Sequence, residues 1–212
     1  MTTIYAGAQI LATRELSVEH RRALAADVRS EADRLYRLVE DLMILARSER
    51  DEIRPVGEPV AVRHLVVAAI EREVARHPES RILLLGANDA SAGEADEGMV
   101  THVIRNLLDN AVRYGSLAGP IEILIDTTSA EVIVRVIDRG PHPDHPASPH
   151  GSGTIAAVTA AGRAGAGIGL YVAERLVKAM RGRMWSGTAE ARGNEFGFAL
   201  ARSEAARQAG DA

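Results

Sequence analysis

The sequence predicts an α+β protein in which an N-terminal helical hairpin precedes a mixed, mostly antiparallel sheet with helices on one face. Two observations predict this fold class. First, a stretch from residue 18 to about residue 50 contains no glycine or proline and repeats apolar residues at helical spacing. Second, amphipathic helical segments along the rest of the chain are separated by short apolar or β-branched runs that are typical of strands.

The hairpin begins with a helix that we expect to end near residue 15. Ser17 is a suitable N-cap for the second helix, and Glu19 lies in its first turn, where negative charge is favourable. Apolar residues of the second helix form a narrow seam with heptad spacing: Leu24, Val28, Leu35, Leu38, Leu42 and Leu45. The seam is explained either by packing within one hairpin or, as we favour, by dimerisation as well.

The next segments predict the first part of the α+β domain. Two prolines and a glycine in charged surroundings indicate a linker over residues 51–59. An amphipathic helix is expected over 61–77, followed by a short strand over 81–85. Residues 87–98 then form a predicted loop, which leads to a helix over 101–114.

The remaining segments predict two strand pairs around one more helix. Residues 121–126 and 131–138 alternate and are β-branched, which indicates an antiparallel hairpin. Residues 139–166 form a long irregular stretch, of the kind that is a functional lid or a disordered loop. A helix with a glycine-rich start follows over 167–180, and two strands with a turn at Arg192 and Gly193 close the fold.

The composition excludes several classes of protein. Without cysteine, the chain has neither a disulfide scaffold nor a thiolate metal site. The net charge of −4 argues against a general nucleic-acid binder. No apolar run approaches the roughly 20 residues of a membrane span, and the first residues do not resemble a signal peptide. We therefore expect a cytoplasmic chain that makes no membrane contact itself.

The helix over 101–114 carries two amides that its packing does not explain. Asn106 and Asn110 lie one turn apart on the same side. They are either solvent-facing or capping residues, or ligands, because an amide oxygen suits a Mg²⁺ ion bound to nucleotide phosphates. The predicted buried face of this helix consists of other residues: Val103, Ile104, Leu107, Leu108 and Ala111. Gly115 is expected to end the helix.

Two further segments fit a nucleotide site. Asp138 ends a predicted strand, and a carboxylate there is able to accept a hydrogen bond from the exocyclic amine of adenine, although aspartate is also a common turn residue. Gly165, Gly167 and Gly169 precede a helix, where glycines let the backbone approach phosphates and the helix N-terminus attracts anions. This run has neither the spacing of a dinucleotide-binding fold nor the lysine of a P-loop.

Four segments in this order, NLLDNAVRYG, VIDRG, GAGIGLYVAERLVKAMRGRMW and GNEFGFAL, resemble the N, G1 and G2 boxes and closing strands of the ATP-binding domain of bacterial sensor histidine kinases, which belongs to the GHKL superfamily. Upstream, TTIYAGAQIL and LVEDLMILARSE resemble the later part of the kinase dimerisation and phosphotransfer hairpin. The resemblance implies a truncated hairpin domain at 1–52, a linker at 53–59, an HATPase-type catalytic domain with a GHKL-type α/β sandwich at 60–203, and a frayed tail at 204–212.

The resemblance also implies ATP and Mg²⁺ as ligands. It makes Asn110 the Mg²⁺ ligand, Asn106 a neighbouring pocket residue, and Asp138 the acceptor for the adenine amine. It further makes Arg113 a basic contact to the phosphates, Tyr114 an aromatic contact to the nucleotide, and Gly140 the glycine that opens the adenine pocket. The resemblance also places three glycines along the phosphates, Gly165, Gly167 and Gly169, with Leu170 packed beneath them.

The chain departs from the family pattern in three places. The phosphoacceptor motif should lie immediately before Thr2, and none of the seven histidines replaces its acceptor; His20, for example, lacks the neighbouring acid and proline. His142 stands where the second glycine of the G1 box is expected. No phenylalanine occurs between Asp138 and Gly165, so the F box of the lid is missing. His142 and its neighbours Asp144, His145 and His150 are candidates for a metal site, although solvated loop histidines are the commoner case.

We therefore expect the ATP-binding catalytic part of a two-component sensor histidine kinase, which transfers the γ-phosphoryl group of ATP to a histidine in trans or within a longer kinase. This chain alone is not expected to autophosphorylate. Expected partners are a response regulator and a second copy bound through the hairpin, in the cytoplasm or as the cytoplasmic part of a membrane-bound sensor. The alternative is a non-catalytic pseudokinase module that binds ATP or docks a response regulator.

Overall fold

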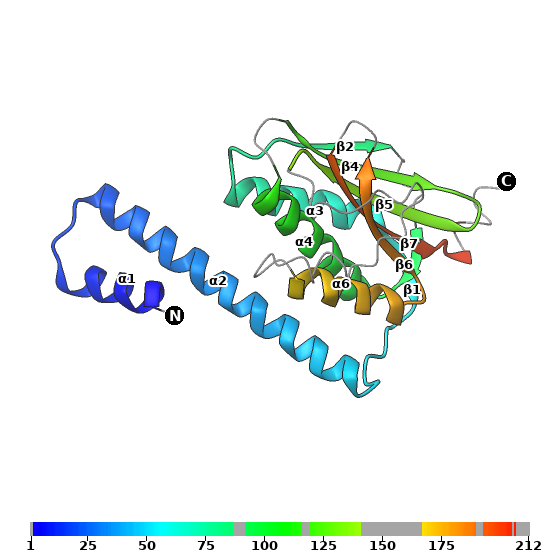
Figure 1. Ribbon diagram of the computed structural model, residues 1–212, viewed down its shortest axis with the longest axis horizontal. Helices are drawn as coiled ribbons and strands as arrows, with labels where there is room; N and C mark the ends of the chain where they lie inside the picture. The colour runs from blue at the N-terminus through cyan, green and yellow to red at the C-terminus, as the bar shows by residue number, and fades with distance from the viewer. Residues whose placement is uncertain are drawn as a thin grey trace. The chain divides into compact units, whose positions relative to one another are not determined.

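The chain folds into two compact units, Met1–Glu49 and Arg50–Ala212. Figure 1 presents the computed structural model, with two helices in the first unit and helices against a sheet in the second. The structure describes residues 2–86, 92–115, 119–140, 167–189, 193–204 and 206. The predicted α+β class is confirmed. In the described ranges, no helix is long and apolar enough to cross a membrane.

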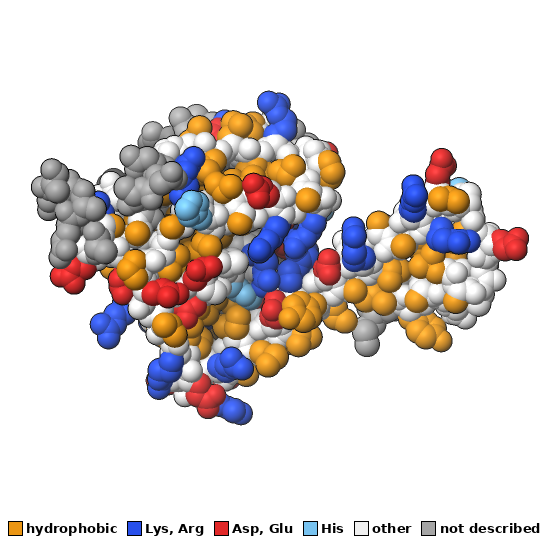
Figure 2. All heavy atoms as spheres, turned by 180° about the vertical axis from the view of Figure 1, so that it is seen from behind, with side chains coloured by type: hydrophobic (Ala, Val, Ile, Leu, Met, Phe, Trp, Pro, Cys, Tyr) orange, Lys and Arg blue, Asp and Glu red, His pale blue; other side chains and the backbone are white. Residues whose placement is uncertain are grey.

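The first unit is a helical hairpin of α1 (Thr2–Thr13) and α2 (Val18–Glu49), as the sequence predicts. Ser17 caps α2, because its hydroxyl oxygen accepts a hydrogen bond from the backbone N–H of His20 at 3.3 Å. The apolar side of α2 stays largely uncovered. Five of its side chains are between 36% and 65% exposed: Leu35, Tyr36, Val39, Leu42 and Met43. Figure 2 shows hydrophobic side chains gathered along this unit.

The second unit is a five-stranded sheet with helices on one face and a separate two-stranded sheet. Its elements are β1 (Glu58–Ala61), α3 (Val62–Arg76), β2 (Ile82–Gly86), β3 (Ala92–Ala95), α4 (Glu97–Tyr114), β4 (Ile121–Thr127), β5 (Glu131–Asp138), α6 (Gly167–Ala179), β6 (Arg183–Ala189) and β7 (Gly193–Ala201). The strand order is β2-β4-β5-β7-β6, and only β2 and β4 run parallel. Helices α3, α4 and α6 lie together on one face of this sheet (Figure 1).

The core between the helices and the sheet is aliphatic. Alternate side chains of β4 and β5 are buried, which is the period expected of strands with one face in a core. On α4, the predicted apolar face is confirmed, because Val103, Ile104, Leu107, Leu108 and Ala111 are all at most 1% exposed. On α6, the expected face is confirmed by the burial of Val172, Leu176 and Val177, and Met180, directly after the helix, is buried as well.

Two short strands lie where the sequence predicts other structure: one spans the end of the linker and the first residue of the next helix, and the other lies in the predicted loop over 87–98. Residues 58–61 and 92–95 pair antiparallel as β1 and β3. Each strand has only four residues, and each includes a proline or a glycine, so neither carries a readable alternation. Helix α4 also begins four residues earlier than predicted. Its N-cap is Asp96, whose Oδ1 accepts from the N–H of Met99 at 3.0 Å.

Helix α4 ends where the sequence predicts, at Gly115, but in a different geometry. The backbone of Gly115 is extended, with φ −65° and ψ 165°, and is not the left-handed conformation of a glycine stop. The residue still has to be small, because a Cβ there would clash with the carbonyl oxygen of Ala111. The same glycine lets the end of α4 approach Asp138, and so begins to form the site.

Candidate functional site

Asp138 is a buried carboxylate at the end of β5. It is 2% exposed and lies directly opposite Asn194 of β7 in the strand register. Its Oδ1 accepts two hydrogen bonds, from the N–H of Gly140 at 2.6 Å and from Nδ2 of Asn194 at 2.9 Å. Both hydrogen bonds that Asp138 accepts from described residues go to Oδ1. The arrangement therefore fixes the carboxylate through one oxygen and keeps Oδ2 for another donor.

Glycines allow three chain segments to meet around this carboxylate. A Cβ on Gly140 would clash with the carbonyl oxygen of Tyr114 at the end of α4 and would lie 2.7 Å from Oδ1 of Asp138. At the start of β7, Gly193 has φ +113°, a conformation that residues with a side chain rarely adopt, and a Cβ there would clash with the carbonyl oxygen of Asp138. The end of α4, the end of β5 and the start of β7 thus lie close together because Gly140 and Gly193 have no side chains.

Asn106 joins α4 to the start of α6. Its side chain is half-buried, and its Nδ2 donates a hydrogen bond to the carbonyl oxygen of Gly169 at 2.9 Å. Gly169 lies against the amide plane, since a Cβ there would be 3.4 Å from Cγ of Asn106. Leu170, the next residue, is 1% exposed and packs in the core. The amide of Asn106 thus holds the first turn of α6, which begins at Gly167, in place.

Asn110 is buried without a complete set of partners. It is 6% exposed, and its Nδ2 is a buried atom with no hydrogen-bond partner among the described residues. Buried polar groups of this kind are uncommon in folded proteins and suggest a missing ligand or water. The oxygen of the same amide is of the kind that Mg²⁺ takes as a ligand. The residue therefore fits the predicted role of a ligand to a Mg²⁺ ion that is also bound by phosphates.

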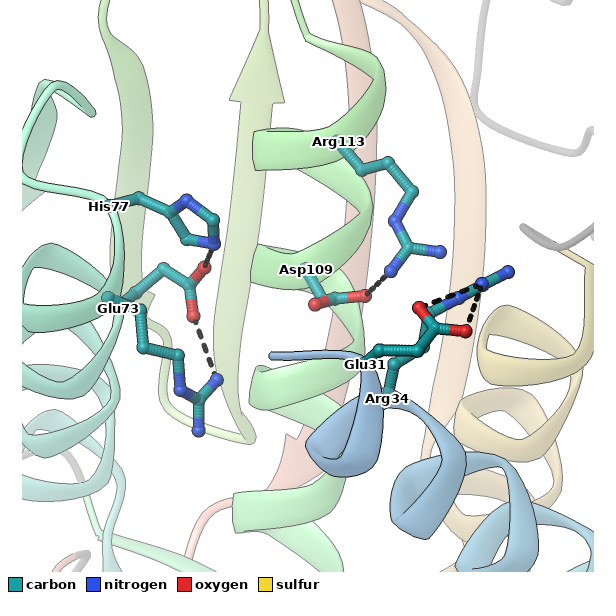
Figure 3. Close-up of polar contacts among 7 residues, drawn as sticks. Glu31, Arg34, Glu73, His77, Asp109 and Arg113 are labelled. Atoms are coloured by element: carbon teal, nitrogen blue, oxygen red, sulfur yellow. Dashed lines mark hydrogen bonds and ion pairs between the residues drawn. The ribbon is translucent and has the colours of Figure 1, made fainter. Parts of the chain in front are cut away.

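Arg113 and Tyr114 occupy the last turn of α4. The guanidinium of Arg113 pairs with Asp109 one turn earlier, with Nη2 and Oδ2 3.4 Å apart (Figure 3). The side chain of Arg113 is 35% exposed, so its charge is accessible at this end of the helix. Tyr114 is half-buried, and its carbonyl oxygen faces Gly140.

Several predicted site residues lie outside the described residues. They are Gly165, the histidine-rich segment with His142, Asp144, His145 and His150, and the segment that stands in place of the F box. Among the residues that the structure does describe, no group of three or more His, Cys, Asp or Glu side chains is placed to hold a metal ion. The metal alternative for the histidine segment therefore stays a prediction.

Asn194 is the site residue that the sequence reasoning missed. It is 4% exposed and donates to both Asp138 and Gly140. Nothing in its local sequence marks it, because asparagine after glycine is an ordinary turn pattern. Only the register of β5 and β7 brings it opposite Asp138.

Comparison with known proteins finds one protein family and several individual proteins with similar sequences. Residues 95–204, just over half of the chain, match the family described as histidine kinase-, DNA gyrase B-, and HSP90-like ATPase. The Adaptive-response sensory kinase SasA of Synechocystis sp. is 26% identical over 184 residues, which are 85% of this chain and 48% of that protein. The Sensor protein KdpD of Clostridium acetobutylicum is 25% identical over 183 residues, 84% of this chain and 20% of that protein. The chain thus spans about half the length, or less, of these curated relatives.

Solved structures resemble the chain as well. The full-length ShkA structure, in complex with AMPPNP, has a TM-score of 0.67 and 27% identity, and covers 95% of this chain and 43% of that one. The Acinetobacter baumannii histidine kinase AdeS has a TM-score of 0.61 and 20% identity, and covers 95% of this chain and 93% of that one. At that identity the likeness to AdeS is evidence of a shared fold alone.

Proposed function

Since the chain belongs to the histidine kinase-, DNA gyrase B- and HSP90-like ATPase family as a sensor histidine kinase, we propose that it binds Mg-ATP and transfers the γ-phosphoryl group to a histidine. The observation that carries this proposal is the buried Asp138 carboxylate, which is fixed through Oδ1 and keeps Oδ2 for an incoming donor. The resemblance of ShkA, whose structure is a complex with AMPPNP, supports a nucleotide as the occupant.

The adenine end of the site is formed by Asp138 and Gly140. The Oδ2 atom accepts a hydrogen bond from the exocyclic amine of adenine, and a charged acceptor makes this bond stronger than one between neutral groups. Gly140 lets the backbone after Asp138 lie against the end of α4, because any side chain there would meet backbone atoms of Tyr114. Tyr114 itself contributes an aromatic ring at the rim.

The phosphate end is formed by α4 and the start of α6. Gly167 and Gly169 begin α6, where free backbone N–H groups and the positive end of the helix dipole favour anions. Asn106 holds this turn through its bond to Gly169. Gly165 and Arg113 add further contacts to the phosphates, and Leu170 packs beneath them. Asn110 would hold Mg²⁺, which supplies neutralisation of phosphate charge during transfer when it is bound.

The protein side of the reaction is then mainly positioning. Phosphoryl transfer needs the γ-phosphorus in line with the attacking nitrogen and its negative charge balanced. We assign the nucleotide-binding role to residues 60–203, the linker to 53–59, and dimerisation and response-regulator docking to the hairpin at 1–52. Because none of the seven histidines lies in the acceptor motif, the acceptor histidine is on a separate polypeptide or in another part of a longer kinase.

A second candidate is a non-catalytic module that binds ATP or docks a response regulator. Two sequence features favour it: His142 in the G1 box, and the lack of phenylalanine between Asp138 and Gly165. Both features concern groups around the nucleotide, and neither removes Asp138 or Asn110. Binding of ATP is thus common to both candidates, and phosphoryl transfer separates them.

The test is transfer to a supplied acceptor. The chain is incubated with γ-labelled ATP, Mg²⁺ and a separate hairpin that carries the acceptor histidine followed by an acidic residue. Label on that hairpin supports the kinase, provided that the Asp138→Asn variant gives much less label under the same conditions. Measurable ATP binding without label on any of several acceptor hairpins favours the non-catalytic module.

A further inference from the structure

Strand β2 forms one outer edge of the five-stranded sheet. It pairs with β4 on one side, and no described strand pairs with it on the other side (Figure 1). Edge strands commonly carry a charged residue or a proline, which hinders pairing with another chain. The opposite outer strand, β6, carries Arg183, whereas the five residues of β2, Ile82–Gly86, include neither a charge nor a proline. Of the two edges, β2 is therefore the less protected.

The hydrogen bonds to β4 decide which backbone groups of β2 face the open edge. The N–H of Ile121 donates to the carbonyl oxygen of Arg81 at 2.8 Å, and Ile82 is the strand partner of Ile121. In a strand, the N–H and C=O of one residue point to one side, and those of the next residue point to the other. The backbone groups of Arg81 and Leu83 therefore point to β4. Those of Ile82 and Leu84 point to the open edge, where no described strand pairs with them.

The side chains of β2 are apolar on both faces of the sheet. Leu83 and Leu85 are 45% and 42% exposed. They lie on the face opposite the helices, because their strand partners on β4 alternate with the buried core residues of that strand. Ile82 and Leu84 lie on the helix side and are half-buried. Exposed apolar side chains beside an open edge favour a partner strand that is itself apolar.

We propose that β2 pairs antiparallel with β2 of a second copy of the chain, about a two-fold axis at Leu84, so that two sheets become one. In this register the two Leu84 residues form a hydrogen-bonded pair, because the backbone groups of both point outward. Leu83 of one copy then lies opposite Leu85 of the other on the outer face. Four exposed leucines thus cover one another, and such cross-strand pairs stabilise a sheet.

The charges at this edge also fit a second copy. The paired strands contain no charged residue, and the two Arg81 side chains stand at opposite ends of the pair, about 20 Å apart along the strands, so they do not repel strongly. A five-residue edge buries little area, so we expect a weak association, with a Kd on the order of 100 µM. Pairing at β2 is thus an additional contact, separate from dimerisation through the hairpin.

The inference goes beyond the proposed function. Strand β4 separates β2 from β5, which carries Asp138, and no residue assigned to the nucleotide lies on β2. Binding of ATP and pairing of β2 are therefore independent claims, and either one can fail alone.

Single cysteines test the register directly, because the chain has no cysteine of its own. Leu83→Cys and Leu85→Cys are made as separate proteins, mixed to allow exchange of subunits, and oxidised mildly at about 100 µM. In the proposed register, residue 83 of one copy faces residue 85 of the other with Cα atoms about 4.5 Å apart, whereas identical residues lie about 7–8 Å apart. Only the first distance suits a disulfide, so the mixture should form linked dimers at least about fivefold faster than either protein alone.

Val56→Cys is the matched control, because Val56 is 65% exposed and lies outside the sheet. It gives the rate of linking by chance collisions. If the mixture links no faster than Val56→Cys, a second copy does not cover this edge, and the proposal is wrong. If Leu83→Cys or Leu85→Cys alone links faster than the mixture, the register at Leu84 is wrong.

Sedimentation of the full chain tests the pairing without a disulfide. At about 500 µM, wild type and Val56→Lys should form species larger than those they form at about 10 µM. Leu83→Lys with Leu85→Lys should not, because charged side chains on an edge strand oppose pairing. Both leucines are exposed, so melting temperatures close to that of wild type are expected for this variant. Equal association of all three proteins would overturn the proposal.

Discussion

Single glycines at the site allow two backbone segments to lie in contact, and Gly140 is the clearest case because it lies against the backbone of Tyr114. A Cβ there would meet the carbonyl oxygen of Tyr114, which belongs to the backbone and cannot swing away. We predict that Gly140→Ala weakens ATP binding at least tenfold and costs about 1–3 kcal/mol of unfolding free energy. Calorimetry and urea unfolding measure the two effects.

A glycine in open surroundings is the control for this prediction. Gly98 in the first turn of α4 is exposed, and the only neighbour that a Cβ would meet is Oδ1 of Asp96 at 3.4 Å. Gly98→Ala should therefore stabilise the protein by about 0.4–1 kcal/mol and leave ATP affinity unchanged. Equal effects of the two substitutions would contradict the account of Gly140.

At the scale of elements, one ion pair joins β5 and β6 across the intervening strand β7. Arg183 Nε and Nη2 donate to the two carboxylate oxygens of Glu131 at 3.1 and 2.8 Å. The hydrogen bonds from Arg183, and its charge, hold the pKa of Glu131 below its ordinary value of 4.5, and Glu131 raises the pKa of Arg183. Because both side chains remain exposed, at 34% and 57%, the pair contributes less than about 1 kcal/mol.

The sign of the pH dependence follows from the lowered pKa of Glu131. The stabilisation is fully present above the pKa of the unfolded carboxyl and is lost as the pH falls through the lower folded pKa. Glu131→Gln should therefore reduce the free energy of unfolding slightly at pH 7 and have no effect at a pH below the folded pKa. Urea unfolding at pH 7 and in strong acid checks this, and an equal loss at both would show that the charge is irrelevant.

The elements also differ in how well the sequence predicts them. Helices α4 and α6 are predicted with their buried faces, because several turns of apolar residues repeat the same period. The short strands β1 and β3 are missed, since four residues give no period and their pairing is long-range. For the same reason the partnership of Asn194 with Asp138 is not readable from the sequence: it depends on the register of β5 against β7.

At the scale of the whole molecule, the hairpin has an exposed apolar side, and we expect a second copy of the chain to cover it. Val39 and Leu42 are 50% and 54% exposed, on successive turns of α2. We predict that wild type sediments as a dimer and that Val39→Glu with Leu42→Glu sediments as a monomer, because two buried charges at an interface are costly. Val56→Glu, at a residue 65% exposed in the second unit, should leave the dimer intact. A wild-type monomer at all concentrations would contradict dimerisation.

The function of the whole molecule is predicted from motifs more than from its shape. Three separated segments, around Asn110, Asp138 and Gly169, indicate a nucleotide site before any fold is known, and the matched family covers all three. The roles of these residues stay predictions, as do those of Gly165 and His142, which lie outside the described residues. Geometry adds the fixed orientation of Asp138 and the unpaired amide of Asn110.

The central claim is that Oδ2 of Asp138 binds the amine of adenine, and Asp138→Asn tests it most directly. With Oδ1 kept as the acceptor for Gly140 and Asn194, the new NH₂ group replaces Oδ2 and becomes a donor. Calorimetry with Mg²⁺ should show ATP binding weakened by at least about tenfold and binding of inosine triphosphate, which has an oxygen in place of the amine, strengthened. An Asp138→Asn variant that binds ATP as tightly as wild type would contradict the account.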